Sequence, residues 1–317
     1  MACSQAEAWE LAKLDEGSFL AMNWQIISEQ IELATGQPFK PFKVVSAQAL
    51  SGGDINYAYR LQGDNKSYFV KLNRADLVTM FEAEFAGLLD MAKTQTVRVP
   101  APIVCGQTTG HSFLVLENLE FGCSNKASDR LLGQQLALMH QQQQPFFGWH
   151  RNNTIGSTLQ PNSQSDDWLT FWREQRLGFQ LKLAADKGYC GRLQANGERL
   201  CSDMAAFFND YVPQPSLLHG DLWAGNAAAD KQGCPVIFDP ACYYGDREAD
   251  LAMTELFGGF NRDFYAAYET VWPLAHGYGV RKTFYNLYHI LNHLNLFAGG
   301  YLRQAESMMA ILLAEIS

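Results

Sequence analysis

LLHGDLWAGNAAADKQGCPVIFDP, the segment Leu217–Pro240, contains three polar side chains in otherwise apolar or turn-forming sequence. They are Asp221, Asn226 and Asp239. A buried carboxylate is costly unless it is paired, hydrogen-bonded or bound to a cation. The segment therefore predicts a site that binds a metal ion or moves a proton.

The composition of the 317-residue chain is typical of a globular protein with enough apolar residues for two lobes. Hydrophobic residues make up 47% of the chain and aromatic residues 13%. A charged fraction of 18% with both signs argues against disorder, and no apolar run of about 18 residues predicts a membrane span. The net charge of -9 gives no basic surface for nucleic acid or anionic lipid. A phosphate ligand would therefore need local compensation by lysine or a metal ion.

The seven cysteines are odd in number and lack CxxC spacing, which predicts reduced thiols and a cytoplasmic location rather than disulfides or a zinc site. Residues 1–21 lack the basic start and apolar core of a signal peptide. Because a second methionine follows at Met22, we interpret residues 1–21 as an N-terminal extension or a remnant of cloning, without an assigned function. The sequence indicates no particular oligomeric state.

Periodicity predicts an α+β fold with two lobes. Short β-strands are expected at 42–53, 55–63, 66–73, 97–107 and 111–120, with one inserted helix at 79–93. Later helices are expected at 128–141, 165–188, 198–211 and 283–299, the second with Ser165 as its N-cap and Gly188 as its stop. We therefore expect an antiparallel β-rich lobe at 22–116, a hinge at 117–120, and a mainly helical lobe at 121–317.

The segment SGGDIN, residues 51–56, joins two of the predicted strands. Its paired glycines, Gly52 and Gly53, would let backbone N–H groups approach a bound phosphate closely. A plain hairpin turn explains the same residues. The segment therefore predicts a phosphate-binding loop only in combination with other signals.

A lysine and a glutamate supply such a signal. Strand alternation places Lys71 on the same face as Phe69. On the following helix, Glu84 projects from the apolar stripe, whereas Glu82 lies about 100° around the axis. A carboxylate on a buried face needs a cation, and Lys71 is the nearest good candidate. A lysine held by a glutamate beneath a glycine loop positions ATP phosphates in kinases.

The opening segment completes this pattern. Phosphoryl transfer needs a carboxylate that orients the attacking hydroxyl and accepts its proton, and Asp221 fits this role. It also needs oxygen ligands for Mg²⁺, for which Asn226 and Asp239 are suitable. Each residue alone is explained as well by a turn. Their joint order, after the glycine loop, the strand lysine and the helix glutamate, makes that explanation a poor one.

The motifs HGDLWAGN, IFDPACYYGDREADLAM and GGF resemble the fructosamine kinase (ketosamine 3-kinase) family, in the aminoglycoside phosphotransferase branch of the protein-kinase-like fold. The resemblance covers nearly the whole chain from about Met22. It implies an ATP- and Mg²⁺-dependent kinase that phosphorylates the 3-hydroxyl of ribulosamine, erythrulosamine or fructosamine adducts, a protein-repair activity. The substrate would be a small ketosamine or a glycated amine.

The resemblance also implies individual roles. Asp221 would be the catalytic base, Asn226 and Asp239 the Mg²⁺ ligands, Lys71 and Glu84 the phosphate-positioning pair, and the backbone around Glu117 and Leu119 the adenine site. Trp223 would contact the sugar or amine, and His219 and Asp250 would hold the catalytic loop. Some relatives carry a cysteine beside the glycines where this chain has Asp54, so a thiol switch is not expected.

Two other functions stay open on the sequence alone. One is a kinase of the same fold that acts on an aminoglycoside or a choline-like amine, which would favour a more acidic cleft. The other is a nucleotide-binding module without turnover. His289 and His293 have i, i+4 spacing compatible with a metal site, but no third ligand accompanies them, so we interpret both as core or surface histidines.

Overall fold

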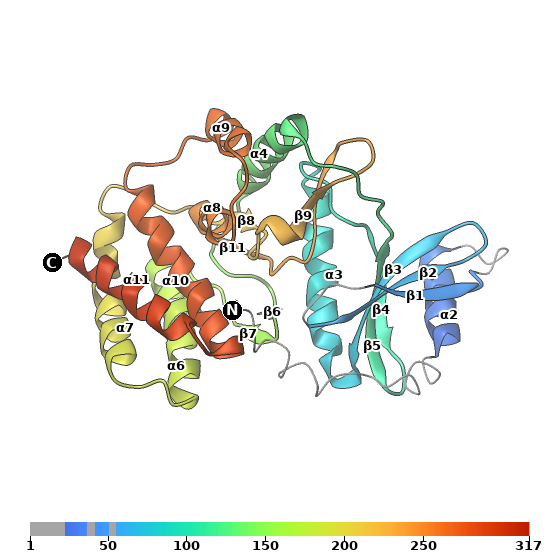
Figure 1. Ribbon diagram of the computed structural model, residues 1–317, viewed down its shortest axis with the longest axis horizontal. Coiled ribbons are helices and arrows are strands. Elements are labelled where there is room, and N and C mark those ends of the chain that lie inside the picture. The colour runs from blue at the N-terminus through green and yellow to red at the C-terminus, as the bar shows by residue number, and fades with distance from the viewer. Residues whose placement is uncertain (1–22, 37–41, 51–54, 317) are drawn as a thin grey trace.

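The computed structural model describes residues 23–36, 42–50 and 55–316 of the chain. Figure 1 shows a sheet-containing lobe beside a larger, mainly helical lobe. This arrangement confirms the expected α+β fold. The predicted N-terminal extension, residues 1–21, lies outside the described residues, as do Gly52, Gly53 and Asp54. The exact lobe boundaries at 116 and 121 stay predictions.

The first lobe contains a five-stranded antiparallel sheet in the order β1-β2-β3-β5-β4. Its strands are β1 (Ser46–Leu50), β2 (Tyr57–Gln62), β3 (Ser67–Arg74), β4 (Pro102–Gln107) and β5 (His111–Glu117). Helix α2 (Trp24–Thr35), which the periodicity did not reveal, packs Ile27 and Ile31 against one face of the sheet. The same core takes Val70 and Leu72 from β3, which leaves Phe69 and Lys71 on the opposite face, as alternation predicts.

Helix α3 (Val78–Lys93) packs between the sheet and the second lobe (Figure 1). Phe81 and Leu88 are fully buried in a core that also includes Trp149 and Cys242 of the second lobe. The indole Nε1 of Trp149 donates a hydrogen bond to Oδ2 of Asp90 at 3.1 Å. The helix therefore belongs to the packing of both lobes.

The second lobe is built from helices with three short strand pairs between them. Its helices are α4 (Lys126–His140), α5 (Trp168–Trp172), α6 (Gly178–Asp186), α7 (Arg192–Asp203), α8 (Arg247–Leu256), α9 (Arg262–Val271), α10 (Tyr278–Phe297) and α11 (Tyr301–Glu315). The strand pairs are β6 (Asn153–Ile155) with β7 (Thr158–Gln160), β8 (Ser216–Leu218) with β11 (Tyr243–Gly245), and β9 (Ala227–Ala229) with β10 (Pro235–Ile237). None of the described helices has the length and apolar character needed to cross a membrane.

The predicted helix at 165–188 is wrong in two respects. Its N-cap is Asp167, whose carboxylate accepts a hydrogen bond from the Thr170 N–H at 2.6 Å, while Ser165 forms a turn with the Asp167 backbone. A π-helical turn at Arg173–Leu177 also separates α5 from α6. This turn buries Arg176, whose guanidinium lies over the rings of Phe171 and Tyr243. Gly188, with φ +87°, follows the end of α6 as expected.

The six cysteines in the described part of the chain are free thiols, as predicted: Cys105, Cys123, Cys190, Cys201, Cys234 and Cys242. Burial raises the pKa of the Cys242 thiol well above its ordinary value. This thiol is therefore kept in its protonated form, consistent with a purely structural role in the core.

Candidate active site

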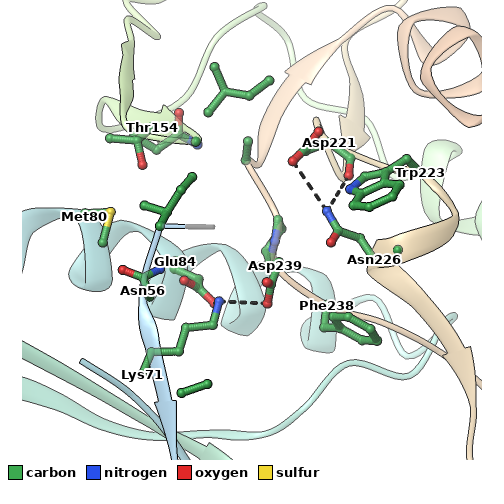
Figure 2. A pocket seen from close by; sticks show the side chains of 18 of the residues that line it. Asn56, Lys71, Met80, Glu84, Thr154, Asp221, Trp223, Asn226, Phe238 and Asp239 are labelled. Carbon is green, nitrogen blue, oxygen red and sulfur yellow. Dashed lines mark hydrogen bonds and ion pairs between the residues drawn. The ribbon is translucent and has the colours of Figure 1, made fainter. Parts of the chain in front are cut away.

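A cavity of about 840 Å³ lies between the sheet and the helical lobe. Its wall contains side chains from three regions that are far apart in the sequence: β3 with α3, the segment after β8, and the segment after β10 (Figure 2). Lys71 and Glu84 come from the first region, Asp221 and Asn226 from the second, and Asp239 from the third. The structure thus brings together the polar residues that the sequence singled out.

Lys71 is held by two carboxylates. Its Nζ lies 2.6 Å from Oε1 of Glu84 and 2.7 Å from Oδ1 of Asp239 (Figure 2). Burial would lower the pKa of Lys71, but the negative charges of Asp239 and Glu84 outweigh it and raise the pKa above its ordinary value. The lysine is therefore a fixed positive charge in the cavity wall. Its contact with Asp239, 168 residues away, was not predicted.

Asp239 follows β10 with φ +60°, a left-handed conformation that costs energy for a residue other than glycine. The side chain is half exposed to the cavity. Such strain at a polar residue in a cavity wall is characteristic of functional sites. The conformation directs the carboxylate toward Lys71 (Figure 2).

Asp221 and Asn226 lie on the opposite side of the cavity from Lys71 (Figure 2). The Asn226 Nδ2 donates to the backbone oxygen of Asp221 at 2.8 Å and approaches its Oδ2 at 3.4 Å. This leaves Oδ1 of Asn226 as an acceptor without a partner among the described residues. Burial raises the pKa of Asp221 to about 7, with further contributions from the charges of Asp239 and Asp250. A carboxylate with a pKa near neutrality is suited to proton transfer.

The loop that carries Asp221 is held by Asp250 at the start of α8. Its two carboxylate oxygens accept hydrogen bonds from the backbone N–H groups of His219, at 2.7 Å, and Gly220, at 2.8 Å. His140, which was not predicted, adds a third contact at 3.1 Å through its Nε2. Burial acts to raise the pKa of Asp250, but these hydrogen bonds and the two nearby histidines hold it below its ordinary value.

His219 adds a second brace to this loop. Its Nε2 lies 2.9 Å from the backbone oxygen of Phe238, which can only accept, so Nε2 carries the proton. Its Nδ1 then accepts the N–H of Asp221 at 3.3 Å. His219 therefore links the Asp221 loop to the residue before Asp239. Gly220 must be glycine here because φ is +82° and a Cβ atom would lie 2.1 Å from the Ala241 oxygen.

The remaining predicted residues also line the cavity. Glu117 and Leu119 do so at the end of the sheet, and Trp223 does so near Asp221. The Glu117 carboxylate pairs with Arg98 at 2.8 Å, so its side chain is already occupied. Gly52 and Gly53 lie outside the described residues, and their role stays a prediction.

The donor set would suit a Mg²⁺ ion that binds together with a nucleotide. The carboxylate of Asp239 and the free Oδ1 of Asn226 are hard oxygen ligands, which this ion prefers. No group of three or more His, Cys, Asp or Glu side chains among the described residues forms a metal cluster. Mg²⁺ bound with a nucleotide needs only one or two protein carboxylates, since phosphates and water supply the other ligands.

Replacement of Glu84 by Ala is expected to lower kcat/KM for ATP by roughly 10-fold or more while the fold is retained. Lys71 would keep Asp239 but lose the carboxylate that fixes its position. Steady-state kinetics and thermal unfolding measure the two effects separately. The matched control is Glu82→Ala on the same helix. The Oε2 of Glu82 lies 3.8 Å from the guanidinium of Arg151 and does not contact Lys71. A silent Glu84→Ala beside a damaging Glu82→Ala would refute the assignment.

Comparison with known proteins identifies the family of the chain. The sequence profile described as fructosamine kinase matches residues 23–315. A probable ketoamine kinase of Synechocystis sp. is 50% identical over 287 residues, which cover 90% of this chain and 95% of the relative. The chloroplastic protein-ribulosamine 3-kinase of Arabidopsis thaliana is 45% identical over 273 residues, 85% of this chain and 83% of that protein.

A solved structure supports the same relationship. The crystal structure of a candidate fructosamine-3-kinase from Haemophilus somnus 129PT superimposes with a TM-score of 0.84 at 30% identity. The match covers 92% of this chain and 97% of that one. Because the family profile spans nearly the whole described chain, and a relative is 50% identical over 90% of it, the chain belongs to the fructosamine kinase family.

Proposed function

We propose that the chain is an ATP- and Mg²⁺-dependent kinase that phosphorylates the 3-hydroxyl of ketosamines, a deglycation activity. The observation that carries the proposal is the single cavity in which Asp221, Asn226 and Asp239 face Lys71 (Figure 2). Relatives named ketoamine kinase and protein-ribulosamine 3-kinase support the choice of substrate. The free cysteines of the described residues are consistent with a cytoplasmic location.

Each polar residue then has a distinct task. Lys71, fixed by Glu84, would hold the ATP phosphates. Asn226 and Asp239 would hold Mg²⁺, which neutralises phosphate charge when bound. Asp221 would orient the sugar hydroxyl for attack and accept its proton. Asp250 would keep Asp221 in place through the hydrogen bonds that it accepts from the backbone N–H groups of His219 and Gly220, and would not itself touch the substrate.

The cavity wall favours a ketosamine over a polycationic aminoglycoside. Apart from Asp221, Asn226 and Asp239, which have the roles given above, its helical-lobe side is formed mainly by apolar and aromatic side chains, with amides from two more asparagines: Asn153, Thr154, Ile155, Trp223, Met253, Phe257, Asn292, His293, Leu296, Phe297 and Tyr301. This part of the described wall therefore lacks the set of carboxylates that several ammonium groups would need. A substrate with one amine is the better fit.

An ADP-release assay across ribulosamine, erythrulosamine and fructosamine adducts of free amino acids tests the proposal. We expect turnover of low-molecular-weight ketosamines, with the two shorter sugars at least as good as fructosamine. Strong preference for fructosamine would overturn that order. Turnover confined to an aminoglycoside or choline would overturn the substrate class, and nucleotide binding without any substrate-dependent ADP release would indicate a non-catalytic module.

A further inference from the structure

His293 in the last turns of α10 is the centre of an aromatic group in the cavity wall. Its ring centroid lies 4.8 Å from that of Phe257, 5.5 Å from that of Phe297 and 5.2 Å from that of Tyr301. All four side chains line the cavity that contains Asp221. Phe297 is about half exposed, at 53%, so the group extends to the cavity mouth. We call Phe257, His293, Phe297 and Tyr301 the aromatic recess.

The hydrogen bonding of His293 defines which nitrogen can bind a ligand. Its Nδ1 lies 2.8 Å from the backbone oxygen of His289, and because a carbonyl only accepts, Nδ1 carries the proton. Burial lowers the pKa of His293 below its ordinary value, so the ring is neutral near pH 7. Nε2 is then an acceptor. It has no hydrogen-bond partner among the described residues and is within reach of solvent.

An acceptor surrounded by aromatic rings suits a particular ligand chemistry. It fits a cationic N–H donor that carries an organic substituent, since the cation is attracted by ring faces and the donor by the imidazole lone pair. A ketosamine has such a group. Its secondary amine is protonated near neutral pH and is attached to C1, two carbons from the C3 that bears the reacting hydroxyl. A substrate with this hydroxyl at Asp221 thus carries its amine into the same cavity.

We propose that His293 recognises the amine of the ketosamine by accepting its N–H hydrogen bond at Nε2, and that the aromatic recess surrounds the amine substituent. The inference rests on the proposed function and adds the residue that distinguishes a ketosamine from a sugar without the amine. The two histidines with i, i+4 spacing in the sequence therefore have different roles. His289 is buried and does not line the cavity, whereas His293 does.

The test compares an N-alkyl ribulosamine with 1-deoxyribulose, which has the same reacting hydroxyl but no amine. His293→Phe keeps an aromatic ring and removes the acceptor. We expect it to lower kcat/KM for the ribulosamine by about 10-fold or more, in line with loss of a hydrogen bond to a charged group. The kcat/KM for 1-deoxyribulose and the KM for ATP should stay unchanged. His293→Gln, with an acceptor oxygen, should restore part of the ribulosamine activity.

The exposed His150, which does not line the cavity, provides the matched control His150→Phe. Thermal unfolding shows whether each variant is folded. Equal losses on both substrates would mean that His293 only packs the helices, and unchanged ribulosamine kinetics would mean that it does not bind the amine. Either result overturns the inference and leaves the proposed function standing. Absence of ribulosamine turnover by the wild-type protein would instead refute the proposed function, and the inference with it.

Discussion

Asp221→Asn is expected to reduce turnover by roughly 10²-fold or more, the usual contribution of a positioned general base. The substitution keeps the shape of the side chain and its contact with Asn226, whose main hydrogen bond goes to the backbone oxygen of residue 221. It removes the group that would accept the hydroxyl proton. ATP affinity in the presence of Mg²⁺ should change little, because Asn226 and Asp239 are the proposed metal ligands.

The measurement combines turnover on the best ketosamine with a titration of ATP in the presence and absence of Mg²⁺. Thermal unfolding serves as the control for the fold. Near-normal turnover of Asp221→Asn would show that this carboxylate is not the base. A loss of nucleotide affinity as large as that of Asp239→Asn would show that the two carboxylates do not have separate tasks.

Asp239→Asn is expected to weaken Mg²⁺-dependent ATP binding by about 10-fold or more, with a matching loss of kcat/KM for ATP. Asparagine tolerates the left-handed conformation found at this position, so the change isolates the effect of charge from that of the backbone. Lys71 keeps Glu84 as its partner. High Mg²⁺ should partly restore binding, because the ligand is weakened rather than removed.

Isothermal titration with ATP at several Mg²⁺ concentrations checks this expectation. ATP binding without Mg²⁺ is the internal control and should be weakened little, since only the metal-dependent part is affected. If Asp239→Asn bound ATP·Mg as tightly as the wild-type protein does, the carboxylate would have no role in holding the metal ion. An equal loss with and without Mg²⁺ would point to the Lys71 contact instead.

Local periodicity was sufficient to predict part of this site. Alternation along a strand placed Lys71 on the cavity face, and helical spacing placed Glu84 rather than Glu82 opposite it. Both deductions use local sequence patterns, and the two residues that they bring together, Lys71 and Glu84, are only 13 residues apart in the chain. The contact of Lys71 with Asp239 depends on how the two lobes pack, and no sequence period records that packing.

Other features could not be predicted from the sequence, for related reasons. Ser165 and Asp167 are both good caps, and the choice between them depends on which side chain reaches a free N–H group. The π-helical turn at Arg173–Leu177 forms around buried Arg176, whose guanidinium packs on the ring of Tyr243 in β11, far along the chain. His293 gave only an i, i+4 signal, because its ring neighbours come from other parts of the chain: Phe257 follows α8 and Tyr301 begins α11.

The packing of α3 between the lobes bears on regulation. Protein kinases control activity by positioning the helix that carries the glutamate partner of the lysine. Here an outward swing of α3 would uncover Phe81 and Leu88 and break the Trp149–Asp90 hydrogen bond. Exposure of two such apolar side chains costs about 3–6 kcal/mol, enough to keep a swung-out state near one part in a hundred or below. The lysine–glutamate pair is therefore expected to stay engaged in nearly all molecules, which leaves no on–off switch at this helix.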